Sequence, residues 1–549
     1  MSLFTASLEF PDGPADAPRL ILIGESLDRW SAAWAADLAS DGEAHAALAA
    51  LFRVQVVDAA EDPALARRAA LVLALTGDAA GLPLALFCLP DGRPVGAVPW
   101  RPLRDQGKTP GLLRTALEFA EAWHQQPEAV TADADHLERL ADSLAAADTG
   151  PALRPGLVLE AAESAALEAA NTLEGGFGPV PRRLDPALLE FLLGRCARAD
   201  APLGLVQQVE RTFAALESGA AHDHLHGGFH RGCEDAAWSR PLAEKRLGDQ
   251  AQLAVLLARA SDVLDQPLHR TLARRALTWV LADLARGDGL FAHGRHAGPP
   301  QAPAGAAYAW TPQGIADLVG DEGADVLCRR FGLAEHDPDQ PGFLAIRSPV
   351  EPATAKRLPE LVNRLAAART ERAQPPRDPT ARLEDQGTLL LALVALESED
   401  PAFATAADAL AARLRSDPLP ARWRADGHGE GTPGPGELAA VARGLLAHHR
   451  ARGGSVVPAL IRALAERAFA AVDAAGHVRL DERTPPALSD TDDGDGPSAA
   501  ALLGHLALDL GEPADLARAN ALVHAHRERL RRAPLALAGL LAVLDRVST

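Results

Sequence analysis

Cysteine is scarce in this 549-residue sequence. The chain has only four, at Cys88, Cys196, Cys233 and Cys328, and they lie far apart. A disulfide framework or a zinc knuckle needs cysteines at close, regular spacing. The sequence therefore predicts four reduced thiols, and it excludes a disulfide-stapled fold and a cysteine-based zinc site.

Basic residues are also in deficit. There are 54 Lys and Arg against 74 Asp and Glu, which gives a net charge of -20. This balance argues against nucleic acid and anionic membranes as partners, because no basic excess can neutralise phosphates. No apolar run reaches the roughly 18 residues of a membrane span, and the start, MSLFTASLEFPDGPADAP, lacks the features of a signal peptide. We expect a cytoplasmic protein.

Tyr and Met occur once each, whereas Ala and Leu dominate. This composition favours helix over sheet for most of the chain. A nucleotide-binding motif of the G-x-x-x-x-G-K-[ST] type is absent, and so is a G-x-S-x-G elbow. A length of 549 residues predicts roughly two to four domains.

The first 105 residues differ from the rest. PRLILIG (18–24) and FRVQVVDA (52–59) are apolar runs of strand length, separated by a helical pattern over 31–51. Residues 82–100, LPLALFCLPDGRPVGAVPW, contain two apolar runs around a Pro-Asp-Gly turn, which predicts a hairpin. This order of strands and helices is typical of a small α/β domain.

From about residue 109 onward, helical periodicity dominates. Some twelve helical segments follow one another, with Gly- and Pro-rich loops between them, and they pair into about six helical hairpins. Six hairpins in series can close into an (α/α)6 toroid around a central pocket, and an open helical solenoid is the alternative. The long irregular stretches 286–312 and 480–497 are expected at a pocket rim, and 488–498 is expected to be a solvated acidic loop rather than a calcium site.

Several segments resemble one family, the spermatogenesis-associated (YyaL-type) thioredoxin-domain-containing proteins. EGGFGPVPRR (174–183) is similar to its GGFG segment, and DHLHGGFHRGCED (223–235) is similar to its DHLGGGFHRYSVD segment. Further similar stretches are 82–100, 306–320 and 493–503, together with Trp238, Pro241, Glu244, Lys245 and Asp249. The resemblance implies an α/β thioredoxin-like domain at 1–108, a helical linker at 109–155 and an all-α, (α/α)6, six-hairpin glycosidase-like domain at 156–549.

Departures from the family pattern bear on activity. The family carries C-H-W-C after its first strand, where this chain reads Ser26-Leu27-Asp28-Arg29. Without two thiols no disulfide can cycle, so this domain is expected to be redox-inactive and to serve a structural or docking role. Pro83 falls where the family places a cis-proline. In the helical domain, PHFEKMLYD has become PLAEKRLGD (241–249), and the acidic loop at 292–305 has lost its carboxylates.

The segment HDHLHGGFHRGCEDAAW (222–238) is the main candidate site. Histidines at 222, 224 and 226 could chelate a metal in an extended loop, but the H-E-x-x-H pattern and a cysteine partner are missing, so no metal is predicted. The alternative is a pocket loop in which Gly227 and Gly228 allow the backbone to approach a ligand. A buried polar cluster that only ties the loop down would look the same in sequence.

The pocket interpretation names twelve residues. We expect Glu244, Lys245 and Asp249 to start the next helix, with Lys245 and Asp249 on one face. The acid–base candidates are Asp223, His230, Asp235 and Glu244. The ligand-binding candidates are His224, Arg231, Trp238, Lys245, Asp249, Trp310, Trp423 and Glu437.

Three functions stay open at this point. The first is an (α/α)6 pocket that binds a carbohydrate or a similar small polar ligand without catalysis. The second is a carbohydrate-active hydrolase or epimerase that uses carboxylate and histidine acid–base chemistry. The third, a thiol-disulfide oxidoreductase, is opposed by the missing thiols. No cofactor is predicted, and a protein partner could dock on the thioredoxin-like domain.

Overall fold

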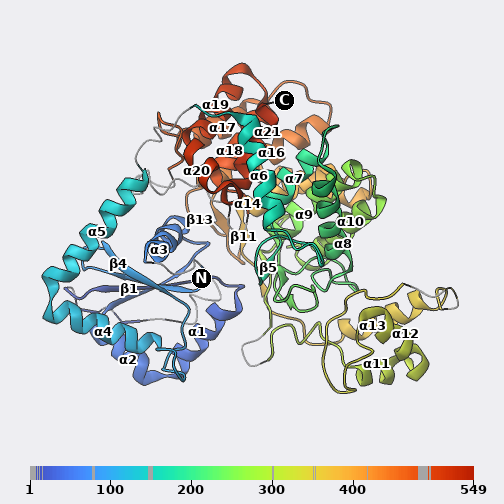
Figure 1. Ribbon diagram of the computed structural model, residues 1–549, viewed down its shortest axis with the longest axis horizontal. Helices are drawn as coiled ribbons and strands as arrows, with labels where there is room; N and C mark the ends of the chain where they lie inside the picture. The colour runs from blue at the N-terminus through green and yellow to red at the C-terminus, as the bar shows by residue number, and fades with distance from the viewer. Residues whose placement is uncertain are drawn as a thin grey trace. The chain divides into compact units, whose positions relative to one another are not determined.

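The computed structural model describes residues 8, 10, 11, 13, 14, 16–76, 81–145, 152–298, 302–349, 352, 354–416, 418–479, 493 and 496–548. The chain forms two compact units, one of residues 1–147 with 478–490 and one of residues 148–477 with 491–549 (Figure 1). Most of the loop expected to be acidic and solvated, 488–498, lies outside the described residues. Among the described helices, none is both long and apolar enough to cross a bilayer.

The first unit is built on a four-stranded sheet. Its strands are β1 (Arg19–Gly24), β2 (Arg53–Asp58), β3 (Leu84–Cys88) and β4 (Pro94–Pro99), in the order β2-β1-β3-β4. β1 is parallel to β2, with Arg19 opposite Arg53, and antiparallel to β3, with Arg19 opposite Cys88. β3 and β4 form the predicted hairpin. The peptide bond before Pro83 is cis, as the resemblance implied.

Helices cover both faces of this sheet (Figure 1). They are α1 (Arg29–Ser40), α2 (Gly42–Leu51), α3 (Pro63–Leu75), α4 (Leu112–Gln125) and α5 (Pro127–Ala145). One core joins α1, α2 and α4 to the sheet, and in it Phe52, Phe87 and Phe119 pack together with ring centroids 5.0 to 6.1 Å apart. The opposite core is closed by α3.

The region expected to be a linker, 109–155, is occupied mainly by α4 and α5. Leu112 and Ala116 of α4 are buried in the first core, and α5 packs on β4 and α3 through Val130, Ala134 and Leu137. These two helices therefore complete the sandwich, because their apolar faces have the sheet as their partner. The thioredoxin-like unit extends well beyond residue 108.

In the described residues of the second unit, six inner helices pack in a closed ring. They are α7 (Pro186–Cys196), α9 (Leu247–Val263), α14 (Leu383–Ala395), α16 (Pro435–Ala451), α18 (Ala499–Leu510) and α21 (Ala538–Val547). Each inner helix packs on the next in this order, and α21 packs back on α7. The ring is therefore the predicted (α/α)6 toroid, and the open solenoid is wrong.

An outer layer surrounds the ring. It consists of α6 (Pro155–Glu168), α8 (Leu203–Ser218), α10 (Pro267–Asp283), α15 (Pro401–Leu414), α17 (Ala459–Phe469) and α19 (Pro513–Ala525). Two short elements, α20 (Arg527–Arg532) and the 3-10 helix η3 (Pro534–Leu537), precede α21. The inner helices are buried nearly all round, as their Leu- and Ala-rich sequences require.

Three small antiparallel sheets link the helices of this unit. They are β5 (Arg182–Arg183), β6 (Gly232–Cys233) and β7 (Pro241–Leu242); then β8 (Lys245–Arg246), β9 (Gly294–Arg295) and β10 (Arg377–Asp378); and β11 (Ala381–Arg382), β12 (Arg422–Trp423) and β13 (Gly429–Glu430). Each sheet pairs segments that lie next to inner or outer helix ends. The sheets therefore fix the loops at one end of the ring.

A repeated device joins these loops to the ring. The side chain of Gln250 in α9 accepts a hydrogen bond from the Phe229 N–H and donates one to the Phe229 carbonyl, both at 2.7 Å. Gln386 in α14 makes the same pair of bonds to Phe291, both at 2.9 Å. The two glutamines stand in the similar sequences RLGDQ (246–250) and RLEDQ (382–386). The chain therefore carries a structural repeat.

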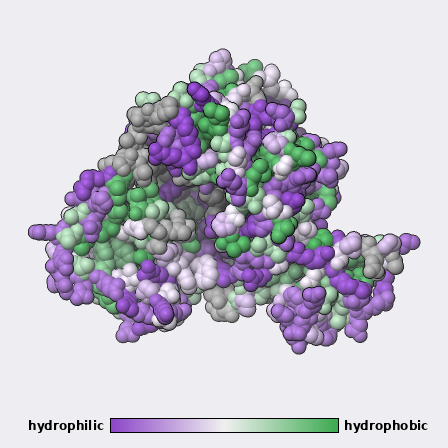
Figure 2. Space-filling model, viewed as in Figure 1, coloured by the Kyte–Doolittle hydropathy of each residue, from purple (hydrophilic) through white to green (hydrophobic). Residues whose placement is uncertain are grey.

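Three further helices lie between α10 and α14. They are α11 (Pro312–Val319), α12 (Asp321–Phe331) and α13 (Leu358–Thr370), which we call the insert. They share their own apolar core, centred on Ile315, Leu327 and Leu365, and Leu225 from the ring's loop packs into it. Hydrophilic side chains predominate on the visible surface of the insert (Figure 2). The insert is therefore attached to the ring partly through the 222–238 segment.

Candidate functional site

The 222–238 segment follows α8 and forms a tight turn closed by a bridge between His222 and Phe229. Gly227 and Gly228 have positive φ angles of 82° and 74°. A Cβ on Gly227 would lie 2.9 Å from the carbonyl oxygen of Arg275, and one on Gly228 would lie 3.0 Å from the Trp279 ring. The glycine pair is therefore needed for close packing on α10.

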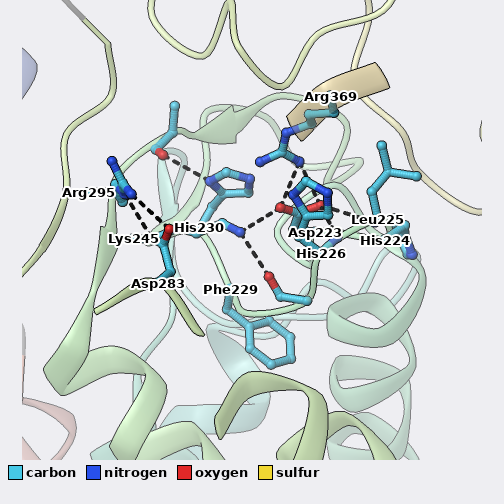
Figure 3. Close-up of polar contacts among 12 residues, drawn as sticks. Asp223, His224, Leu225, His226, Phe229, His230, Lys245, Asp283, Arg295 and Arg369 are labelled. Atoms are coloured by element: carbon cyan, nitrogen blue, oxygen red, sulfur yellow. Dashed lines mark hydrogen bonds and ion pairs between the residues drawn. The ribbon is translucent and has the colours of Figure 1, made fainter. Parts of the chain in front are cut away.

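A buried ion cluster lies at the centre of this region (Figure 3). The Lys245 ammonium donates to Asp223 Oδ2 at 2.6 Å, and the Arg369 guanidinium donates to both Asp223 oxygens at 2.8 and 2.9 Å. Asp223 also accepts the backbone N–H of Leu225. Three segments distant in sequence, the turn, β8 and α13, are thus joined by one carboxylate.

Burial and charge set the protonation states in the cluster. Burial by itself would raise the pKa of the Asp223 carboxyl, but Lys245 and Arg369 outweigh it and hold that pKa well below its usual value. Burial lowers the pKa of the Lys245 ammonium to about 8, and Asp223 opposes that shift. Lys245 also lies 4.7 Å from the centre of the Trp279 ring. At neutral pH the cluster therefore holds two cations and one anion.

The histidines of the turn are buried or partly buried. Burial lowers the pKa of His224 to about 4 and that of His230 to about 3, and it holds the pKa of His222 well below its usual value. His230 donates through Nδ1 to the Ala243 carbonyl at 3.0 Å, and its ring contacts Tyr308 edge-on. His224 donates through Nε2 to the Gly219 carbonyl. In the described part of the chain, His, Cys, Asp and Glu form no metal-binding group of three or more.

Three of the predicted site residues hold the backbone. Asp235 accepts hydrogen bonds from Ser239 N–H at 3.0 Å, from its hydroxyl at 2.6 Å and from Arg240 N–H at 2.9 Å. Trp238 is buried and donates to the Glu174 carbonyl, and the backbone N–H of Arg231 donates to the Glu244 carbonyl. The hydrogen bonds of Asp235 close a turn, and Trp238 belongs to the packed core.

The expected helix start at 244–249 is wrong. Lys245 is in β8, and α9 begins at Leu247, so Lys245 and Asp249 share no helix face. Lys245 instead faces Asp223. Glu244 is buried, and its Oε2 atom has no hydrogen-bond partner among the described residues. The sheet pairing of Lys245 with Arg295 explains the difference, because it keeps this segment extended.

The two tryptophans proposed as sugar platforms are both buried. Trp310 belongs to the core of the insert, with the Arg372 guanidinium 3.6 Å from its ring centre. Trp423 is in β12, and the residue is 4 % exposed. Neither ring offers an open face of the kind a sugar stacks on.

A second polar group, which we call the ring-end group, lies at the N-terminal ends of three inner helices. Asp249, Asp385 and Glu437 each occupy the third position of their helix, α9, α14 and α16. Their negative charges suit the positive end of a helix dipole. His293 donates to Asp385 at 3.0 Å, and Glu437 accepts from the Gly434 N–H at 2.6 Å.

The carboxylates of the ring-end group are shifted in opposite directions. Burial by itself would raise the pKa of Asp385, but Arg382, His293 and Arg246 outweigh it and lower that pKa. Burial raises the pKa of Glu437, with Gly434 N–H opposing. Asp385 and His293 were missed in the sequence. The signal that could have found Asp385 is the repeat of RLGDQ in RLEDQ.

Two cavities accompany these groups. A small one of about 270 Å³ adjoins the ion cluster, and Asp223, His224 and His230 are among the residues that line it. A larger one of about 730 Å³, which we call the ring cavity, is bounded by the inner helices α7, α9, α14, α16 and α18. None of the predicted site residues lines the ring cavity. Its polar lining is Glu190, Gln252, Arg259, Glu384, Thr388 and Arg443.

The thioredoxin-like unit has no thiol where the family carries two. Asp28 instead caps α1 and accepts from the Ser31 N–H and hydroxyl, both at 2.7 Å, and the Ser26 N–H donates to Asp58. Cys88 is buried in β3, and burial raises its pKa to about 11. A thiol this basic is a poor nucleophile.

Comparison with known proteins bears on the first unit most directly. Residues 13–142 match a family model named Thioredox_DsbH, described as "Protein of unknown function, DUF255". Human spermatogenesis-associated protein 20 is 30% identical over 178 residues, which cover 29% of this chain and 23% of that protein. The chain is homologous to spermatogenesis-associated protein 20 over that stretch. An uncharacterized protein of Caenorhabditis elegans is 26% identical over 187 residues, 34% of this chain and 25% of that protein.

The chain thus spans about a quarter of the length of the curated relatives it matches. Solved structures with a similar arrangement are more distant. Cellobiose 2-epimerase from Spirochaeta thermophila has a TM-score of 0.41 at 16% identity, over 68% of this chain and 86% of the other. A GH76 alpha-mannanase from Bacteroides thetaiotaomicron has a TM-score of 0.43 at 9% identity, over 72% and 96%. The (α/α)6 fold itself is evident from the closed ring of helices.

Proposed function

We propose that the helical unit binds a small polar ligand, such as a mono- or disaccharide, in the ring cavity. The observation that carries the proposal is the cavity itself. It is the larger of the two cavities, and its free space of about 730 Å³ includes its opening to solvent. Its lining comes mainly from five inner helices, which pack on one another in the ring.

The lining offers what a polyhydroxylated ligand requires. Glu190 and Glu384 accept hydrogen bonds, Arg259 and Arg443 donate them, and Thr388 does both. A sugar hydroxyl is both donor and acceptor, so a lining of mixed polarity suits it better than a lining of one charge. Val255, Leu256, Leu391 and Leu502 supply apolar surface for the C–H faces of a ring.

Gln252 adds a specific anchor. Its amide lies in the lining of the ring cavity, and the Oε1 atom is buried without a hydrogen-bond partner among the described residues. A buried carbonyl oxygen of this kind normally has a partner. A ligand hydroxyl in the cavity would supply one.

Acid–base chemistry on such a ligand is the second candidate function. It is favoured by the ring-end group, in which the pKa of Asp385 is lowered and that of Glu437 is raised. A paired general base and general acid need two carboxyl groups whose pKa values are shifted in opposite directions. Asp385 Oδ1 lies 2.7 Å from where a Cβ on Gly248 would stand, and Gln252, one turn further along α9, lines the cavity.

For the thioredoxin-like unit we propose a docking role without redox chemistry. Ser26 and Arg29 stand where the family carries its two cysteines, and Asp28 between them caps α1 by accepting from Ser31. A protein partner is the expected occupant of this unit's surface.

Calorimetric titration of the full chain with a panel of mono- and disaccharides tests ligand binding. We expect at least one sugar to bind, and Glu384→Gln to weaken it roughly tenfold, the loss for one hydrogen bond to a charged group. Glu210→Gln is the matched control, because Glu210 is exposed on the outer helix α8. Wild-type protein that binds no sugar in the panel, or a Glu384 variant equal to its control, would overturn the proposal.

Turnover is tested separately. The bound sugar is incubated with the protein in D2O and followed by proton NMR, which detects both hydrolysis and exchange at a ring carbon. Asp385→Asn should abolish any turnover while the sugar still binds. Binding without turnover would leave the first function and exclude the second.

A further inference from the structure

The small cavity beside the ion cluster has a lining of two kinds. Polar side chains line one part, with Asp223, His222 and Arg369 among them. Apolar side chains line the rest: Leu225, Pro241, Phe343 and Leu344. The cavity is much smaller than the ring cavity, so only a small ligand can occupy it. It is separate from the ring cavity, since no residue lines both.

Two of the polar lining residues have hydrogen-bonding atoms that the protein leaves unused. Both ring nitrogens of His222, and Nε of Arg369, are buried without a hydrogen-bond partner among the described residues. The two residues are 2 % and 3 % exposed. Buried donors are almost always paired, so two such residues on one cavity point to a ligand inside it.

The charges around the cavity favour an anion. Lys245 and Arg369 are both cationic, and Asp223 is the carboxylate that neutralises one of them. A third cation, Arg275, donates to the His224 carbonyl on the same turn. Asp223 is the sole acidic residue in the cavity lining, and its oxygens are already engaged by Lys245 and Arg369. Asp283, a second carboxylate near Lys245, is paired with Arg295. The region therefore has an unbalanced positive charge, and burial strengthens its effect.

We propose that this cavity binds a small organic carboxylate. One carboxylate oxygen would accept from Nε of Arg369 and the other from His222, while the short carbon chain would lie against Leu225, Phe343 and Leu344. The Nη1 atom of Arg369 already holds Asp223. The Nε edge is then the part of the guanidinium that a ligand can reach.

The proposal also gives the insert a part in binding. Arg369 belongs to α13 of the insert, and His222 belongs to the turn of the ring unit. A carboxylate held by both would add a contact between the two. The site therefore lies at the joint where His226 already donates to the Ala366 carbonyl at 3.0 Å.

Isothermal titration of the full chain with acetate, pyruvate and butyrate, at constant ionic strength, tests this. We expect one of the three to bind, and His222→Phe to raise its dissociation constant roughly tenfold or more, because a hydrogen bond to a charged group is lost. His222 has no hydrogen bond to lose on substitution, and Phe keeps the ring contacts to His224 and Phe229. The variant should therefore fold.

Arg369→Lys is the second variant, since it keeps a cation beside Asp223 but removes Nε. Arg364→Lys, exposed on the same helix, is its matched control and should bind as the wild type does. Failure of all three carboxylates to bind would overturn the proposal, and so would a His222→Phe protein with unchanged affinity. Binding of inorganic phosphate in preference to every carboxylate would also overturn it, because the apolar lining would then have no role.

Discussion

Removing the charge of Asp223 should destabilise the helical unit more than any surface change. Asp223→Asn leaves Lys245 and Arg369 buried, 0 % and 3 % exposed, without their counterion. Breaking one partner out of a buried ion cluster costs about 3 to 5 kcal/mol. Two cations lose their partner here, so we expect the upper part of that range.

Urea unfolding followed by tryptophan fluorescence measures this effect, because Trp279 lies directly under the Lys245 ammonium. The control is Asp325→Asn, which breaks the exposed pair with Arg329 on α12 and should cost about 0.5 kcal/mol or less. Asp223→Asn combined with Lys245→Met and Arg369→Met should recover much of the loss, since no charge is then left unpaired. A loss below about 1 kcal/mol for Asp223→Asn, or a triple variant no more stable than the single one, would refute the reasoning.

Three other outcomes are expected. Burial lowers the pKa of His224 from about 6.5 to about 4 in the folded chain, so this residue alone should lower the free energy of unfolding by roughly 2 to 3 kcal/mol between pH 7 and pH 4.5. His222 and His230, whose pKa values are also lowered, should add to this fall, which urea titrations at the two pH values would measure. Gly228→Ala should lower the free energy of unfolding by about 1 to 3 kcal/mol, because the residue has a positive φ and the new Cβ would contact the Trp279 ring. The control is Gly427→Ala, which also has a positive φ but no atom within 4 Å of the new Cβ. Thermal melts of the two variants isolate the effect of the contact with Trp279. The native protein should give no turnover in an insulin-reduction assay. Cys88 should react with a thiol reagent only after unfolding, because burial raises its pKa to about 11. If Cys88 of the folded protein reacted as fast as an exposed thiol, this expectation would be wrong.

The fold was largely readable from the sequence, whereas the contacts around the candidate site residues were not. Strand-length apolar runs and repeated amphipathic helices carry local signals, which is why the sheet and the six hairpins were predicted. The limits of the first unit were not, since α4 and α5 look like any other helices until their apolar faces meet the sheet.

Site residues depend on contacts that sequence does not show. Asp223 was found, but its partner Arg369 comes from α13, 146 positions away. Lys245 was taken for a helix residue because the extended pairing of β8 with β9 is only two residues long. The ring cavity was missed altogether, because its lining comes from five helices that are distant in sequence and forms no motif.

The paired glutamines, Gln250 and Gln386, have a consequence for how this protein can diverge. Each glutamine bonds only to backbone atoms, of Phe229 and Phe291, so it holds its loop in place whatever side chains follow. The two positions after each phenylalanine carry His230 and Arg231 in one loop and Ala292 and His293 in the other. The glutamines thus hold the loops, and the residues after each phenylalanine are different ones. Mutation can change those loop side chains without disturbing the backbone that the glutamines hold. A molecule assembled this way can lose one activity and acquire another while its architecture stays intact.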